Sequence, residues 1–147
     1  MTAIITNALI SACLVGLRCR YDGRTKTLPN LAEYENKYNL TPVCPEIEGG
    51  LDVPRPKSWI ENGSGKDVLD GNTIVVNENG QDVSLSYLDG AKKVLELARS
   101  KDARVAILKS KSPACGCGQV YNADKLVNGN GVTAELLMSH GIKVIAV

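Results

Sequence analysis

Phenylalanine is absent from this chain of 147 residues, and tryptophan and histidine each occur only once. The hydrophobic core must therefore be built from leucine, isoleucine, valine and alanine. An excess of charge is also missing, because 17 lysines and arginines against 16 acidic residues leave a net charge of +1. A nearly neutral chain gives no general electrostatic reason to expect a nucleic acid or a membrane surface as a partner.

Long hydrophobic runs are missing as well. No segment approaches the roughly 20 apolar residues of a membrane-spanning helix, and the N-terminus does not have the basic and apolar pattern of a signal peptide. We therefore expect a cytoplasmic protein with no membrane partner. The length is typical of a single domain over residues 1–147, which is large enough to bury a core.

The chain contains five cysteines, an odd number that excludes a complete disulfide framework. In a cytoplasmic domain of this size, cysteines indicate metal binding or catalysis before disulfides. The alternative for any one of them is a small buried hydrophobic side chain, which free cysteine often is. Their positions relative to the expected strands help to separate these two interpretations.

Short apolar runs alternate with helical patterns, which predicts an α/β fold with a mainly parallel sheet, flanking helices and Rossmann-like layering. The expected strands cover residues 7–12, 40–43, 72–76, 105–108 and 142–147. The expected helices cover residues 31–38, 85–100 and 132–140, with Asn30 and Ser84 as N-caps and Gly141 after the last helix. Residues 45–72 predict an ordered, loop-rich excursion, and residues 120–130 predict a turn-rich segment.

Three cysteines follow predicted strands. Cys13 and Cys44 come directly after theirs, and Cys115 lies on the polar loop after residues 105–108. The ligand crevice of an open α/β sheet lies outside the carboxyl ends of the strands, so we expect the three thiols to meet there. Three thiolates suit zinc, copper(I) or an iron–sulfur cluster, and they leave one coordination position open for chemistry. The spacing matches neither a zinc ribbon nor a ferredoxin, so it leaves the metal open.

An ordered set of short motifs runs through almost the whole chain. These are Ser11-Ala12-Cys13-Leu14, Arg20-Tyr21-Asp22-Gly23, Cys44-Pro45-Glu46, Gly49-Gly50-Leu51, Pro54-Arg55, Leu108-Lys109, Ser112-Pro113-Ala114-Cys115-Gly116 and Gly131-Val132-Thr133-Ala134. Each piece is weak alone, and the ordered set is specific. With these motifs the chain resembles the thiouracil desulfidase family.

The resemblance implies a 4Fe-4S cluster held by Cys13, Cys44 and Cys115, with one iron free to bind the sulfur of the substrate. Cys19 and Cys117 lie outside the shared three-cysteine pattern, and Cys117 is the alternative to Cys115. The implied reaction converts 2- or 4-thiouracil to uracil and sulfide by redox-neutral hydrolysis. Such a cluster is sensitive to oxygen, so an aerobic preparation is expected to lose or replace it.

Two further residues match the acidic and hydroxyl catalytic groups of the family. Glu46 would move protons between water, the substrate ring and the departing sulfide, or it is a surface or helix-start carboxylate, as most glutamates are. Ser112 would hydrogen-bond with the substrate ring, or it is a turn hydroxyl ahead of Pro113.

Four charged residues are candidates for binding a small thio-nucleobase: Arg20, Asp22, Arg55 and Lys109. The alternative is that they only form ion pairs around the loops. His140 is interpreted as a cation favoured at a helix C-terminus.

Two other functions stay open. The substrate would be a tRNA thiouridine if the basic group at residues 18–26 binds phosphates, although the near-zero net charge disfavours this. A non-catalytic metal-binding or redox-sensing module would use the two extra cysteines for disulfide exchange.

Overall fold

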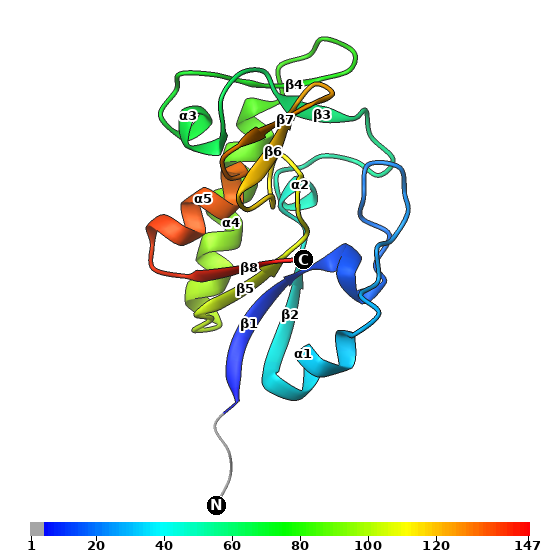
Figure 1. Ribbon diagram of the computed structural model, residues 1–147, viewed down its shortest axis with the longest axis vertical. Coiled ribbons are helices and arrows are strands. Elements are labelled where there is room, and N and C mark those ends of the chain that lie inside the picture. Colours follow the sequence, from blue (N-terminus) through cyan, green and yellow to red (C-terminus); the bar gives the residue numbers. More distant parts are fainter. Residues whose placement is uncertain (1–4) are drawn as a thin grey trace, which may run out of the picture.

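A four-stranded parallel sheet organises the computed structural model, which describes residues 5–147 (Figure 1). The first four residues of the predicted domain lie outside the described residues. The strands lie side by side in the order β2 (Tyr38–Val43), β1 (Thr6–Ser11), β5 (Val105–Leu108) and β8 (Lys143–Ala146), and all neighbours are parallel. The strand β5 is a continuous apolar run, and the middle of β1 is one as well, Ala8-Leu9-Ile10, as expected for strands covered on both faces. The predicted parallel α/β fold is confirmed.

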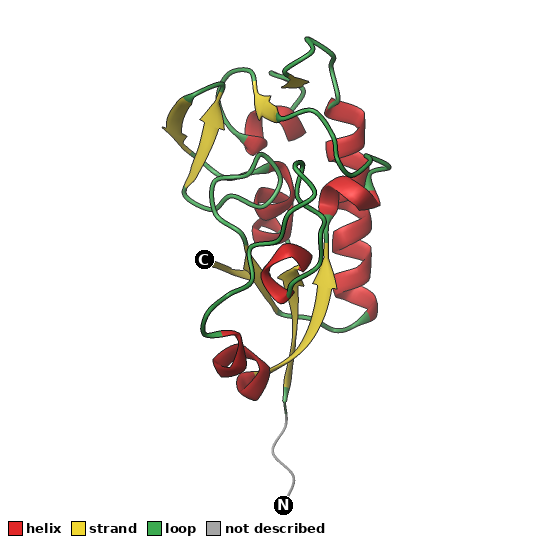
Figure 2. Cartoon of the chain, turned by 90° about the vertical axis from the view of Figure 1, so that its right-hand side faces the viewer, coloured by secondary structure: helices red, strands yellow, loops and turns green. Residues whose placement is uncertain are grey.

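Helices cover both faces of the sheet (Figures 1 and 2). On one face α4 (Ser84–Ser100) and α5 (Val132–Ser139) pack against each other and the strands, and α1 (Leu31–Lys37) lies on the other face. The buried residues of α4 fall on one side of the helix, as its apolar period predicts. Within residues 5–147, no helix is long and apolar enough to cross a membrane.

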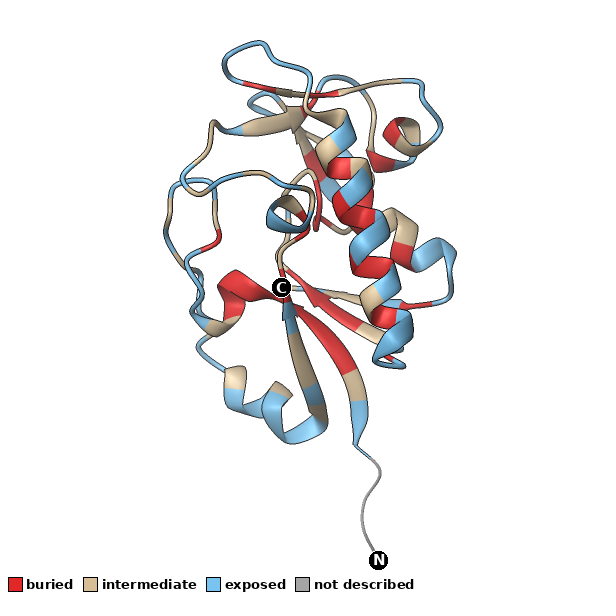
Figure 3. Cartoon of the chain, turned by 180° about the vertical axis from the view of Figure 1, so that it is seen from behind, coloured by how far each residue is buried: buried red, intermediate tan, exposed pale blue. Residues whose placement is uncertain are grey.

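The central strand β1 belongs to two hydrophobic cores, because successive side chains of a strand point to opposite faces. Leu9 packs in the larger core with α4 and α5, whereas Ala8 and Ile10 pack in the smaller core, against which α1 also packs. Figure 3 shows buried residues concentrated in β1, β5 and the facing sides of α4 and α5. Both cores therefore meet at β1.

A smaller layer lies beyond the carboxyl ends of the parallel strands (Figure 1, upper part). It contains the antiparallel pair β3 (Ser58–Ile60) and β4 (Val75–Asn77), the hairpin of β6 (Gln119–Asn122) and β7 (Lys125–Asn128), and the short helices α2 (Pro45–Glu48) and α3 (Gly65–Leu69). The expected excursion at residues 45–72 thus includes two short helices and a strand.

Two local predictions are wrong. Residues 119–128 form a hairpin and not only turns; its turn contains Ala123 at a φ of 55°, in place of the asparagine or glycine that marks such turns. Ser84 does not cap α4, because the helix begins at Ser84 itself. The Ser84 N–H donates to the carboxylate of Asp82 at 2.9 Å, and its hydroxyl accepts the N–H of Val75 at 2.8 Å.

Gly90 in the middle of α4 allows α2 to approach the helix backbone directly. A Cβ at this position would overlap the carbonyl oxygen of Pro45. Glycine weakens a helix by about 1 kcal/mol relative to alanine. The close contact between the backbones of α2 and α4 explains why glycine is nevertheless present at this position.

We predict that Gly90→Ala lowers the free energy of unfolding by about 1–3 kcal/mol, the usual cost of overpacking, although alanine is the better helix former. Denaturant unfolding measures the change. The matched control is Glu96→Ala on the exposed side of the same helix, which should stay within about 0.5 kcal/mol of the wild type. Stabilisation by Gly90→Ala would show that α2 does not need this contact.

Candidate functional site

A cavity of about 290 Å³ lies at the carboxyl ends of β1, β2 and β5. Residues that follow these strands line one side, and Ser58 and Tyr121 reach it from the smaller layer. Ligands of open α/β sheets bind at this edge. The cavity is thus the place where the fold favours a functional site.

Cys13 reaches the cavity from the end of β1. The strand passes into a single turn of 3-10 helix, η1 (Ala12–Val15), which buries Cys13. The carbonyl oxygen of Cys13 accepts the N–H of Lys26 at 2.9 Å, so the returning loop holds this turn.

Cys44 lines the same cavity directly after β2. It is the N-cap residue of α2, and Pro45 occupies the first helical position, where a proline costs no hydrogen bond. Its carbonyl oxygen accepts the N–H of Glu48 at 2.9 Å, and its thiol donates to the carbonyl oxygen of Cys19 at 3.7 Å. The thiol is therefore fixed by both the helix and the neighbouring loop.

The Cys115 loop is held by the start of α5. The first N–H groups of a helix have no partner within it, and here they donate to the loop carbonyls. Gly131 donates to Gly116 at 2.7 Å and Val132 donates to Pro113 at 2.8 Å. The helix start thus satisfies the polar backbone of a loop that is largely buried.

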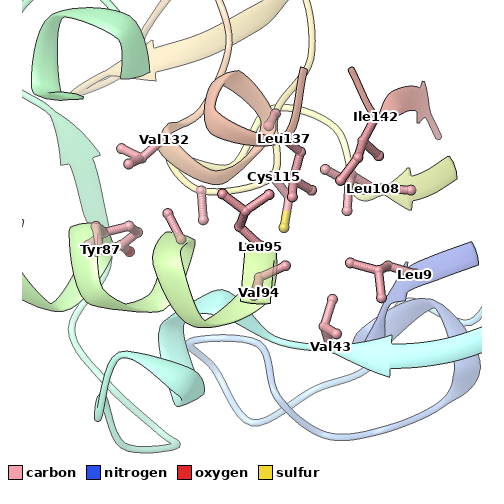
Figure 4. Close-up of a cluster of buried hydrophobic side chains, with 14 of the residues drawn as sticks. Leu9, Val43, Tyr87, Val94, Leu95, Leu108, Cys115, Val132, Leu137 and Ile142 are labelled. Atoms are coloured by element: carbon pink, nitrogen blue, oxygen red, sulfur yellow. The ribbon is translucent and has the colours of Figure 1, made fainter. Parts of the chain in front are cut away.

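The Cys115 side chain is buried in the larger core and lines the cavity. Figure 4 shows its sulfur among the side chains of Leu95, Leu108 and Leu137. The N–H of Cys115 donates to the hydroxyl of Ser112 at 2.7 Å. Ser112 therefore has the predicted alternative role of a turn hydroxyl ahead of Pro113. Burial, the largest cause, raises the pKa of the Cys115 thiol.

The other two cysteines differ in their placement. Cys19 is buried in the cavity wall, where its carbonyl oxygen accepts the Cys44 thiol and its own thiol contacts Cys13, whereas Cys117 is half-buried and does not line the cavity. The contact with Cys19 lowers the pKa of Cys13, and the same contact raises the pKa of Cys19 to about 11. Across residues 5–147, no three His, Cys, Asp or Glu side chains are grouped to hold a single metal ion.

Glu46 and Arg55 form a buried ion pair in the cavity wall. Nη2 of Arg55 lies 3.3 Å from Oε2 of Glu46, and the side chains are 6% and 12% exposed respectively. Burial raises the pKa of Glu46, while the charge of Arg55 opposes that rise. Glu46 is therefore not a surface carboxylate, and Arg55 pairs with the proposed catalytic group.

The remaining charged candidates divide into two groups. Arg20 and Lys109 line the cavity, and burial followed by the charge of Arg20 lowers the pKa of Lys109. Asp22 is exposed outside the cavity, where its carboxylate accepts the N–H of Arg24 at 3.0 Å, so the structure does not bring it to the site. His140 lies at the C-terminal end of α5, also away from this cavity.

Sequence reasoning did not select three tyrosines that line the cavity: Tyr21, Tyr87 and Tyr121. Tyr87 is buried on α4, and the Lys57 amino group lies 5.9 Å from the centroid of the Tyr121 ring. Tyr21 lies within the motif Arg20-Tyr21-Asp22-Gly23, in which only the two charged residues were predicted to bind substrate. Nothing in the local sequence marks Tyr87 or Tyr121, because they meet the cavity only in the folded chain.

Fold and site together define an α/β protein with a thiol-lined cavity at the carboxyl edge of a parallel sheet. Residues 8–147 match the 2-thiouracil desulfurase family, and the chain belongs to this family, which confirms the resemblance seen in the motifs.

Two similar proteins support this assignment. The uncharacterized protein YbbK of Bacillus subtilis (strain 168) is 39% identical over 141 residues, which cover 94% of this chain and 93% of that protein. Among solved structures, the 4Fe-4S-dependent thiouracil desulfidase TudS matches with a TM-score of 0.80 and 35% identity, over 96% of this chain and 90% of TudS.

We predict that Arg55→Met lowers the free energy of unfolding by about 3 kcal/mol, because it leaves the buried Glu46 carboxylate without its partner. Adding Glu46→Gln should recover more than half of that loss, since an amide needs no counter-ion. Denaturant unfolding of the wild type, both single variants and the double variant measures the coupling. If Arg55→Met costs as much in the Glu46→Gln background as in the wild type, the two side chains do not stabilise each other.

Proposed function

We propose that this protein removes sulfur from 2- or 4-thiouracil, using one water molecule to release uracil and hydrogen sulfide without net oxidation or reduction. The observation that carries this proposal is the convergence of Cys13, Cys44 and Cys115 on a cavity that also contains a buried carboxylate. Membership of the 2-thiouracil desulfurase family and similarity to TudS support it.

Cys13, Cys44 and Cys115 are the residues that would hold a 4Fe-4S cluster, the cofactor named for TudS. The donor set fits this group, because cysteine thiolates are the protein ligands of iron–sulfur clusters, and here they come from three separate elements around one cavity. When held by three thiolates, the cluster supplies an iron without a protein ligand, a soft Lewis acid able to polarise a thiocarbonyl.

Glu46 is the residue we propose as the general acid and base. Arg55 contacts its Oε2 atom, and Oε1 is the oxygen that remains for water or the substrate ring. The carboxylate would take a proton from the water that attacks the thiocarbonyl carbon and return a proton to the departing sulfide. The two protons of the attacking water leave with the sulfide as hydrogen sulfide, so the hydrolysis needs no external oxidant or reductant.

Three polar side chains of the cavity wall would orient the ring: Ser112, Arg20 and Lys109. The Ser112 hydroxyl accepts the N–H of Cys115 at 2.7 Å, and its own hydrogen can be donated to the Cys115 sulfur or to a ligand. Arg20 and Lys109 bring positive charge that favours the polar heteroatoms of a nucleobase. These roles concern binding and orientation, whereas Glu46 moves the protons.

We predict that Glu46→Gln retains the cluster and still binds thiouracil, while turnover falls by roughly 100-fold or more, the usual scale for the loss of a general acid–base group. Sulfide or uracil release is measured on anaerobically reconstituted protein, with iron content determined on the same sample. Wild-type turnover at equal iron content would make Glu46 a bystander and leave the proton transfer to another group.

Cys115 and Cys117 form a matched pair for testing which thiol binds iron. We expect Cys117→Ser to keep nearly the wild-type iron content after anaerobic reconstitution, because Cys117 does not line the cavity. Cys115→Ser should lose most of the bound iron. The opposite outcome for the two variants would transfer the ligand role to Cys117.

A further inference from the structure

The buried guanidinium of Arg55 has donors to spare at the cavity. Arginine carries five N–H donors. Nη1 donates to the carbonyl oxygen of Asp52 at 3.2 Å and Nη2 to Glu46 at 3.3 Å, and within residues 5–147 no other hydrogen bond of this guanidinium is found. The side chain is 6% exposed and lines the cavity. The remaining N–H groups are available at the cavity, so a ligand with a suitably placed acceptor could form a charge-assisted hydrogen bond here.

Glu46 connects this donor group to the thiols. It forms the ion pair with Arg55, and it belongs to the short helix α2 that begins directly after Cys44. It lines the same cavity as Cys44 and Cys115. The cavity wall thus offers a sulfur-binding region, then an acceptor at Glu46, then a donor at Arg55.

Thiouracil rings have an edge that matches this order. In 4-thiouracil, the sulfur on C4, the N3–H donor and the C2 carbonyl acceptor follow one another around the ring. In 2-thiouracil the same order runs from the sulfur on C2 through N3–H to the C4 carbonyl. With the sulfur toward the thiols, N3–H faces a carboxylate and the remaining carbonyl faces a guanidinium. Both are charge-assisted hydrogen bonds, the stronger kind.

We propose that Arg55 and Glu46 together recognise the N3–H and second carbonyl of the substrate, which makes Arg55 a specificity-determining residue. This inference rests on the proposed desulfuration. The substrate class is a ring with a thiocarbonyl, an N–H and a carbonyl in consecutive positions, without a substituent on N3. Arg55 then has two roles: it forms an ion pair with Glu46, and it donates a hydrogen bond to the second carbonyl of the substrate ring.

Substrate analogues test the recognition in the wild-type protein itself. Anaerobically reconstituted protein of known iron content is assayed with 4-thiouracil, with pyrimidine-4-thione, which lacks the C2 carbonyl, and with 3-methyl-4-thiouracil, which lacks N3–H. We expect kcat/KM to fall roughly 10- to 150-fold for each analogue, the scale for losing a hydrogen bond to a charged group. Equal kcat/KM for all three compounds would overturn the proposal.

Arg55→Met separates recognition from the support of Glu46. If Arg55 binds the carbonyl, the preference for 4-thiouracil over pyrimidine-4-thione should shrink to about 3-fold or less in this variant. If Arg55 only holds Glu46, both substrates slow equally and the preference stays at the wild-type value, which contradicts the proposal. Arg55→Lys keeps the charge but not the planar fork, so it should restore part of the preference, and it serves if Arg55→Met does not fold.

Binding of the product distinguishes a failure of this inference from a failure of the proposed function. Calorimetry on the reconstituted wild type compares uracil with pyrimidin-4-one, which lacks the C2 carbonyl, and we expect uracil to bind at least 10-fold more tightly. Fully loaded protein that releases no sulfide from 4-thiouracil would overturn the proposed function even if this preference is present. Normal sulfide release with equal binding of the two rings would overturn the role of Arg55 alone.

Discussion

The parallel pairing of β2, β1 and β5 is the constraint on which the site depends. Parallel neighbours end at the same edge of a sheet, so the segments that leave these strands arrive at one place. Cys13 and Cys19 belong to the smaller core and Cys115 to the larger one, on opposite faces of the sheet. The thiols therefore surround the cavity from both sides of the sheet edge, although they are far apart in the sequence.

Close backbone contacts connect this arrangement to the rest of the fold. At Gly131 a Cβ would overlap the carbonyl oxygen of Ala114, so the Cys115 loop and the start of α5 pack without a side chain between them. The contact of α2 with α4 at Gly90 has the same character, and α2 carries Glu46. Helix packing thus positions both a thiol and the carboxylate. The positions of these two cavity side chains therefore depend on backbone contacts outside the cavity itself.

The sequence predicts the layers of this protein well and the details of its cavity less well. Residues 105–108 are a compact apolar run and α4 has a clear apolar period, so strand, helix and the placement of Cys13 and Cys44 after strand ends could be predicted. The sequence alone could not show that Arg55 forms an ion pair with Glu46. That contact depends on how residues 45–72 fold back over the edge of the sheet. Cys19 and Asp22 are close in sequence, yet only Cys19 faces the cavity, a difference set by the path of one loop.

Whether three thiolates of this chain hold a cluster with one open iron is tested most directly by Mössbauer spectroscopy. Protein reconstituted anaerobically with isotopically labelled iron is measured before and after addition of 4-thiouracil. We expect a 4Fe-4S spectrum in which the signal of one iron changes on addition of the thio-compound while the others stay constant. Tight binding of zinc in place of iron, or a cluster spectrum that 4-thiouracil leaves unchanged, would contradict a desulfidase site at Cys13, Cys44 and Cys115.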